Sequence, residues 1–313
     1  MPHAHRLPLL RRDFLRRCAA TSLGASAWSF AGGRESQAIE PIQRGAGGSF
    51  FKYSLAAYSY RDLLQAKSPR ERLSLEDFIA DCAKLGLQGT ELTSYYFPEN
   101  PTPEFLRGLR RQCFLLGLEV SGTAVGNDFC FPAGEKRDAE IASVKRWVDH
   151  AAILGAPVIR IFSGHPHGTS EDEARKLTVS AIEECCQYAG EHGVVLALEN
   201  HGGLTATAAG LLDLVKAVQS PWFGVNLDTG NFHGPDPYAE LVQLAPYAVN
   251  VQVKVSMSPE GGKRERADFG RLARIVADAG YRGYIVLEFE ENENPREACP
   301  RYVDEMRAAF EAV

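Results

Sequence analysis

From residue 50 onward, short apolar runs alternate with longer segments in which apolar residues recur every three or four positions. The short runs predict strands at 51–58, 87–93, 118–124, 157–163, 194–199, 223–228, 249–255 and 284–289. The longer segments predict helices at 74–85, 102–116, 135–154, 171–192, 205–219, 236–246, 266–279 and 296–312. Several helices end at a glycine directly before the next strand, as at Gly86, Gly117, Gly155 and Gly280, and glycine commonly ends helices.

Eight strand–helix pairs over residues 50–313 predict an α/β fold that is a single (β/α)8 TIM barrel. An open, doubly wound sheet is the alternative. Such a sheet would place a Gly-rich phosphate-binding turn after its first strand, and the stretch YSYRDLLQ at 58–65 contains no glycine. The closed barrel is therefore favoured.

The strand at 249–255, VNVQVKV, has valine at every second position and polar residues between. Side chains alternate between the two faces of a strand. In a barrel one face packs against the helices and the other points inward, so the valines are expected outside and Asn250, Gln252 and Lys254 inside. An antiparallel sheet with one solvent face would show the same alternation, but the neighbouring helices favour the barrel.

The same alternation predicts an inward carboxylate near the end of three other strands. It places Glu199, Asp228 and Glu288 inside, together with Asn226. The carboxyl ends of barrel strands form the face where active sites lie in this fold. The sequence thus predicts three carboxylates that converge at one end of the barrel.

Three carboxylates in one buried site repel each other and require a positive partner. One divalent cation is a simple solution, and oxygen ligands favour Mn or Mg, with Co or Zn as the softer options. The alternative is that Lys254 and Arg160 neutralise the carboxylates through salt bridges alone.

Four stretches carry a resemblance to a known family: LALENHGG (196–203), VNLDTGNF (225–232), VNVQVKV (249–255) and GYIVLEFE (283–290). They resemble the sugar phosphate isomerase/epimerase family with the xylose isomerase-like barrel, over residues 50–313. The resemblance implies Glu199, Asp228 and Glu288 as ligands of one divalent metal. The family usually has His at the remaining ligand position, where this chain has Gln252, whose carbonyl oxygen suits a hard cation better than Zn or Co. His201 is an alternative ligand.

The resemblance also implies proton transfer next to a carbonyl, through an enediolate, by two carboxylates that act as base and acid. We expect Glu199 and Glu288 in these roles. Lys254 is expected to steady an oxyanion, and Asn231, which lies three residues after Asp228, stands close to where the family tends to have a substrate-contacting His. Further substrate-binding candidates at strand ends are His201, His165 and Glu91.

The N-terminal 33 residues differ from the rest. An arginine cluster that includes Arg11 and Arg12 precedes a short stretch of small and apolar residues, which is typical of an export signal and resembles the twin-arginine type. We therefore expect residues 1–33 to be this signal, residues 34–49 to be a linker, and the mature protein to be periplasmic, or membrane-tethered if the signal is not cleaved. The mature chain itself is expected to contain no stable membrane span.

Net charge and cysteine usage exclude several classes. The formal charge is −6, and residues 1–33 hold five arginines and one aspartate, a net +4, so the remainder carries −10. This charge argues against nucleic acid as a partner, including for the endonucleases built on this barrel. The seven cysteines form no CxxC pair, which favours buried free thiols, although disulfides remain open.

The expected function is a metal-assisted isomerase or epimerase of a sugar or sugar-like substrate. A small-molecule carbohydrate is the expected partner, and a homo-oligomer is left open. One alternative is a lyase or hydrolase acting on 3-keto-glycosides, which needs the same proton removal. The other is a non-catalytic sugar-binding barrel, suggested by Gln252. In the loop after the strand at 249–255, Lys263, Arg264 and Arg266 suggest an anion site or a solvated charge run.

Overall fold

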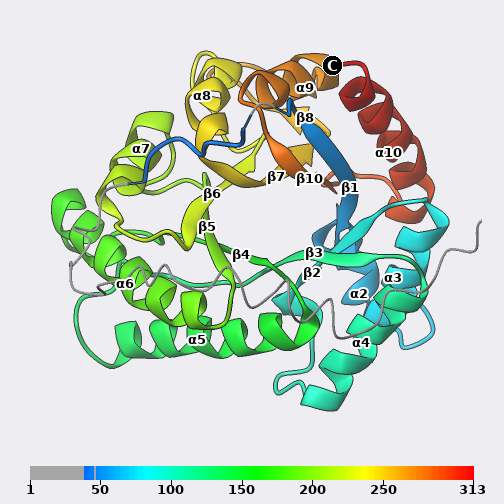
Figure 1. Cartoon of the computed structure of the whole chain (residues 1–313), viewed down its shortest axis with the longest axis horizontal. Helices are drawn as coiled ribbons and strands as arrows, with labels where there is room; N and C mark the ends of the chain where they lie inside the picture. The colour runs from blue at the N-terminus through cyan, green and yellow to red at the C-terminus, as the bar shows by residue number, and fades with distance from the viewer. Residues whose placement is uncertain (1–38, 46) are drawn as a thin grey trace, which may run out of the picture. The chain divides into compact units, whose positions relative to one another are not determined.

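Eight parallel strands close into a barrel in the computed structural model, which describes residues 39–45 and 47–313. The order around the barrel is β1-β10-β7-β6-β5-β4-β3-β2, so each strand pairs with its neighbours in the chain and β1 closes onto β10. The helices surround the strands (Figure 1). The predicted TIM barrel is confirmed, and the doubly wound sheet is excluded.

The element bounds lie close to the predicted ones. The barrel strands are β1 (Phe50–Ala56), β2 (Gly89–Thr93), β3 (Glu119–Ala124), β4 (Val158–Ile161), β5 (Val195–Glu199), β6 (Phe223–Asp228), β7 (Ala248–Lys254) and β10 (Arg282–Glu288). The main helices are α3 (Leu75–Lys84), α4 (Pro103–Leu115), α5 (Glu135–Leu154), α6 (Glu171–Glu191), α7 (Ala208–Ala217), α8 (Pro237–Leu244), α9 (Phe269–Asp278) and α10 (Pro295–Glu311).

Short elements at the strand ends were not predicted. The first strand stops at Ala56, because Ala57–Tyr60 forms a 3-10 turn that leads into the single-turn helix α2 (Arg61–Leu64). Two further 3-10 turns are Ser94–Tyr96 and Ala245–Tyr247. After β7, the antiparallel pair β8 (Ser256–Met257) and β9 (Glu265–Arg266) closes the loop that carries the basic residues.

Local sequence explains where the helices start and stop. Seven of the main helices begin after a polar residue whose side chain accepts a hydrogen bond from a backbone N–H of the first turn, and α3 has a full capping box between Ser74 and Asp77. The predicted stop at Gly155 adopts φ of 76°, a left-handed conformation that favours glycine. Because each helix leads directly into the next strand, these start and stop signals also limit where the strands can begin.

The two faces of the strands separate as predicted. On β7, Val251 and Val253 are fully buried on the outer side of the barrel, and Asn250 and Gln252 contact side chains across the interior. The barrel interior is therefore polar at the level of these two residues, whereas its outer face is apolar.

Residues 39–45 and 47–49 form neither helix nor strand, but they contact the barrel. The backbone N–H of Ile42 donates to Pro246 O at 3.0 Å, and the guanidinium of Arg44 bonds Ala248 O and lies over the ring of Tyr281. These contacts are at the starts of β7 and β10, the end of the barrel opposite the carboxylates. The expected export signal, residues 1–33, lies outside the described residues and stays a prediction.

The cysteines of the described residues are free and buried, as favoured from the sequence: Cys82, Cys113, Cys130, Cys185, Cys186 and Cys299. Within the same residues, none of the helices combines the length and the apolar character that crossing a membrane requires.

Candidate active site

Four charged side chains lie at the carboxyl ends of consecutive barrel strands. Glu199 ends β5, Asp228 ends β6, Lys254 ends β7 and Glu288 ends β10. All four are buried, with at most 7 % of their surface exposed. In the parallel register Glu288 pairs with Lys254, whereas Asp228 pairs with Gln252 and Glu199 with Asn226, and each of the four charged residues is the last of its strand. The structure therefore brings the predicted carboxylates together.

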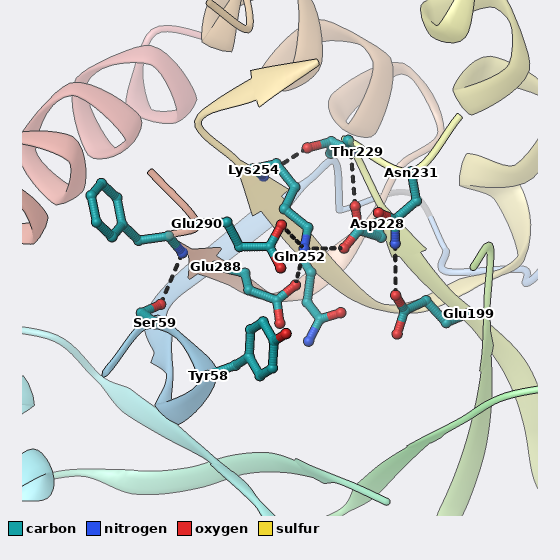
Figure 2. A network of polar contacts seen from close by, with 12 residues as sticks. Tyr58, Ser59, Glu199, Asp228, Thr229, Asn231, Gln252, Lys254, Glu288 and Glu290 are labelled. Carbon is teal, nitrogen blue, oxygen red and sulfur yellow. Dashed lines mark hydrogen bonds and ion pairs between the residues drawn. The ribbon is translucent and has the colours of Figure 1, made fainter. Parts of the chain in front are cut away.

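The ammonium of Lys254 is the centre of this group (Figure 2). Its Nζ lies 2.8 Å from Glu288 Oε2, 2.8 Å from Glu290 Oε2 and 3.4 Å from Asp228 Oδ2. Glu290 was not among the predicted residues, although it shares the parity of Glu288. It lies just beyond the end of β10, where strand alternation no longer fixes the direction of a side chain.

Glu199 is held by a second cation. Arg160 on β4 places its Nε 2.8 Å from Glu199 Oε2, and Asn231 donates from Nδ2 to Glu199 Oε1 at 2.8 Å. The guanidinium of Arg160 also lies 3.9 Å from the ring centroid of Phe162. Both carboxylate oxygens of Glu199 are thus engaged, and the Phe162 ring packs against one face of the Arg160 guanidinium.

Asp228 is oriented by backbone contacts. Its N–H donates to Asn200 Oδ1 at 2.9 Å, and its Oδ1 accepts from the N–H of Gly230 at 2.8 Å. Its Oδ2 is buried and has no hydrogen-bond donor among the described residues, apart from the longer contact with Lys254. A buried carboxylate oxygen in this state has spare capacity for a cation.

Negative charge exceeds positive charge in this cluster. Four carboxylates, those of Glu199, Asp228, Glu288 and Glu290, face two cations, those of Lys254 and Arg160. When all four carboxyl groups are ionised, the formal surplus is two negative charges, which equals the charge of one divalent cation. The salt bridges of Lys254 and Arg160 that the sequence suggested as an alternative to a metal are therefore formed, but they neutralise only part of the negative charge.

The pKa values reflect this imbalance. Burial raises the pKa of Glu199 to about 7, against the opposing effect of Arg160, and Glu288 adds to the rise. Burial also raises the pKa of Asp228 well above its usual range, with repulsion from Glu199 and Glu288. The pKa of Glu288 is lowered, because Lys254 and Arg160 outweigh the effect of its burial. The cluster thus holds carboxyl groups of unlike proton affinity, which suits acid–base chemistry.

Gln252 lies below Lys254 and belongs to a hydrogen-bonded chain in the barrel interior. Its Oε1 accepts from Asn226 Nδ2 at 2.6 Å, and its Nε2 donates to Glu91 Oε1 at 2.6 Å. Figure 2 shows the amide oxygen on the side of Glu199 and the nitrogen on the side of Tyr58. Gln252 therefore presents its oxygen toward the strands that carry Glu199 and Asp228.

The donors of this site suit a hard divalent cation, since carboxylate and amide oxygens are the ligands that Mg and Mn prefer. No three His, Cys, Asp or Glu side chains of the described residues surround a common point as metal ligands. The ammonium of Lys254 contacts oxygens of Asp228 and Glu288, so an ion bound to these oxygens would share them with Lys254 or displace it.

The other predicted substrate-binding residues lie in different surroundings. Glu91 is buried inside the barrel beneath Gln252. His201 is at the rim, with its ring 4.4 Å from that of Phe162, and its pKa is lowered by burial and by Arg160. His165 is exposed on the loop after β4, and its N–H donates to Asp128 Oδ2 at 3.3 Å. Glu91 therefore supports the site from within, and the two histidines lie at its edge.

Two of the three basic residues after β7 are paired with the protein itself. Arg264 bonds Glu291 at 2.7 Å, and Arg266 bonds Glu305. This pairing favours the solvated-charge interpretation of the loop over an anion site. Tyr58, on the 3-10 turn after β1, was not predicted from the sequence. It lies beside Glu288 and Glu290 (Figure 2), and burial and these two carboxylates raise its pKa.

A model of the xylose isomerase-like TIM barrel family matches residues 79–308, and the chain belongs to this family. It is the sugar isomerase- and epimerase-like family that the sequence resembles, so the predicted class of enzyme is confirmed at that level.

Individual relatives are distant. Inosose dehydratase of Erwinia tasmaniensis is 24% identical over 267 residues, which cover 72% of this chain and 85% of the relative. The structure resembles D-psicose 3-epimerase of Clostridium cellulolyticum, with a TM-score of 0.69, 16% identity, and coverage of 83% of this chain and 99% of that one. It also resembles a 3-keto-D-glucoside 4-epimerase of E. coli, with a TM-score of 0.64, 16% identity, and coverage of 82% and 99%.

Proposed function

We propose that the protein is a metal-assisted isomerase or epimerase of a sugar or sugar-like substrate that carries a carbonyl group. The observation that carries the proposal is that four buried or partly buried carboxyl groups face only two cations at the carboxyl end of the barrel, a formal surplus of two negative charges when all four are ionised. A binding protein gains little from buried carboxylates that repel each other, whereas a divalent cation and a proton-transfer reaction both use them.

We assign Asp228, Glu199, Glu288 and the oxygen of Gln252 as the residues that would hold the metal, with Mn or Mg favoured. When bound there, such an ion would polarise the carbonyl oxygen of the substrate and so make the neighbouring C–H more acidic.

Glu199 and Glu288 are the proposed base and acid. They come from β5 and β10, which are separated by β6 and β7 around the barrel, so they approach a substrate from different sides. One removes the proton next to the carbonyl, and the other returns a proton to the same carbon in an epimerisation. In an isomerisation the proton returns to the former carbonyl carbon, and the hydroxyl proton passes to the former carbonyl oxygen. Lys254, which contacts Asp228 and Glu288, is the proposed group that stabilises the negative oxygen of the enediolate.

Elimination is the second candidate, because one relative is named a dehydratase and one similar structure is of a 3-keto-glucoside epimerase. A lyase acting on a 3-keto-glycoside removes the same type of proton, and the second carboxyl group then protonates the departing oxygen. A free sugar or glycoside is favoured over a phosphorylated one, given the export signal proposed for residues 1–33.

The test is proton exchange. The purified full chain is incubated in D2O with ketoses, aldoses and 3-keto-glycosides, each with Mn, Mg, Co or Zn, and 1H NMR follows the signal of the carbon next to the carbonyl. We expect this signal to disappear for one class of substrate, with an epimer, an isomer or an elimination product as the outcome. The Glu288→Gln variant is the control for adventitious exchange. Sugar binding that chelator leaves unchanged, without exchange under any metal, would support the non-catalytic alternative.

A further inference from the structure

Four buried side chains form a closed ring of hydrogen bonds in the barrel interior. Asn250 Nδ2 donates to Glu91 Oε2 at 2.9 Å and to Asn226 Oδ1 at 2.8 Å. Asn226 Nδ2 donates to Gln252 Oε1 at 2.6 Å, and Gln252 Nε2 donates to Glu91 Oε1 at 2.6 Å. Each of the four is at most 2 % exposed. The ring spans β2, β6 and β7, so Glu91 reaches across the interior of the barrel.

The carboxylate of Glu91 sets the direction of every bond in this ring. An ionised carboxylate only accepts hydrogen bonds, whereas an amide both donates and accepts. Both amides that face Glu91, those of Asn250 and Gln252, must therefore turn their NH2 groups to it. The oxygen of Gln252 is then left on the opposite side, where Asn226 donates to it. A rotation of the Gln252 amide by half a turn would set its oxygen against a carboxylate oxygen.

We propose that Glu91 is a positioning residue that fixes the Gln252 amide so that its carbonyl oxygen, and not its NH2 group, faces the carboxylate cluster. The direction matters because an amide oxygen can bind a cation or accept from a substrate hydroxyl, and an NH2 group can do neither. Glu91 would act through its bond to Gln252, and not by contact with the cation or the substrate. The metal readout below rests on the proposed function, and the stability readout does not.

Three variants test the ring: Glu91→Gln, Gln252→Glu and the double variant that combines them. Glu91→Gln keeps the size of the side chain but lets the Gln252 amide take either direction. Gln252→Glu places two carboxylates at the 2.6 Å contact. The double variant exchanges donor and acceptor at this contact, and the carboxylate introduced at position 252 has oxygens on both sides whichever way it turns. Ser121→Ala is the matched control, since Ser121 is buried in the same interior and bonds Ser54 at 2.7 Å, outside the ring.

The first measurement is urea unfolding at pH 8.5 with chelator, where no metal takes part. We expect Gln252→Glu to lower the urea midpoint, and the double variant to recover at least about half of that loss through the restored donor–acceptor pair. If the urea midpoint of the double variant is no higher than that of the less stable single variant, the inference is overturned. The comparison remains valid when a single variant fails to fold, because the double variant is then expected to fold.

The second measurement is Mn2+ affinity by calorimetry. Loss of a side chain that orients a ligand commonly weakens metal binding by about 10- to 100-fold. We expect such a loss for Glu91→Gln, recovery to within about threefold for the double variant, and no change for Ser121→Ala. If Glu91→Gln binds Mn2+ as tightly as the wild type, the inference about Glu91 is overturned, and the proposed function is not. A wild-type protein that binds no Mn2+ overturns the metal part of the proposed function. The inference about the ring is then decided by the urea unfolding of the single and double variants.

Discussion

Arg160 on β4 and Glu199 on β5 form an ion pair of 2.8 Å in which both side chains are more than nine-tenths buried. An ion pair in this setting differs from those on the surface, because neither partner has water as an alternative. Burial raises the pKa of Glu199, the proposed base, and Arg160 opposes this rise.

Replacement of Arg160 by Met is expected to destabilise the protein by about 3–5 kcal/mol at pH 8, since Glu199 is left buried without its cation. The loss should be smaller at pH 5.5, because a neutral Glu199 does not need the partner. Urea unfolding at the two pH values measures this difference. The matched control is Arg271→Met, which removes a half-exposed pair with Asp236 at 3.5 Å and should change stability by less than about 1 kcal/mol. Equal losses of stability for Arg160→Met at both pH values would show that the loss does not come from the ion pair with Glu199.

Glu288 is expected to be essential for turnover without being essential for the fold. A carboxyl group that acts as general acid or base contributes a factor of about 10² to 10⁴, so Glu288→Gln should reduce the exchange rate by that factor and leave the circular dichroism spectrum unchanged. Glu290→Gln is the matched control, because Glu290 contacts the same ammonium at the same distance of 2.8 Å. Activity above about a tenth of the wild type in Glu288→Gln would exclude its acid–base role.

Strand alternation predicted most of this site. It placed Glu199, Asp228, Gln252 and Glu288 inside the barrel, because the two-residue period and the order of the strands determine both the face and the end of the barrel at which a side chain lies. The eight strand–helix pairs were likewise predicted from apolar periodicity, since the apolar period of strands, about two residues, differs from that of helices, about 3.6 residues.

Sequence alone could not predict which groups pair. Lys254 reaches Glu290, which lies beyond a strand end, and Glu91 bonds residues on a strand across the barrel. Both contacts depend on the reach of long side chains and on the stagger of the strands, and neither property leaves a periodic signal. Glu91 was predicted to contact substrate because it lies near the end of a strand, whereas in the structure it bonds Gln252 in the barrel interior.

Lys254 and a divalent cation are expected to compete for the same oxygens. Lys254→Met removes the ammonium from Asp228, Glu288 and Glu290, which should destabilise the metal-free protein by about 3–5 kcal/mol. Because an ion bound to the folded state adds stability, Mn2+ should restore more stability to this variant than it adds to the wild type.

Urea unfolding with chelator and with Mn2+ measures both effects. Lys145→Met is the control, since its pair with Glu184 at 2.8 Å is partly exposed and remote from the cluster. If Mn2+ stabilises Lys254→Met no more than the wild type, the ion does not share oxygens with Lys254.

The pH dependence of stability should carry the signature of Glu91. Burial and the charge of Glu288 raise the pKa of Glu91 from 4.5 to about 7, although Asn250 and Gln252 oppose the rise. The folded state therefore holds this proton more tightly than the unfolded state does. Its contribution to stability is complete below pH 4.5 and is lost as the pH rises through 7, a change of about 3 kcal/mol.

Glutamine carries no such proton, so Glu91→Gln should show a smaller fall in the free energy of unfolding between pH 5 and pH 8 than the wild type. Urea unfolding with chelator at pH 5, 6, 7 and 8 gives the two profiles. Glu119→Gln is the control of opposite sign, because Lys52 and Tyr284 lower the pKa of Glu119, and its removal should not reduce the fall. If Glu91→Gln retains the full wild-type slope, Glu91 is already ionised across this range, and the slope belongs to Glu199 and Asp228.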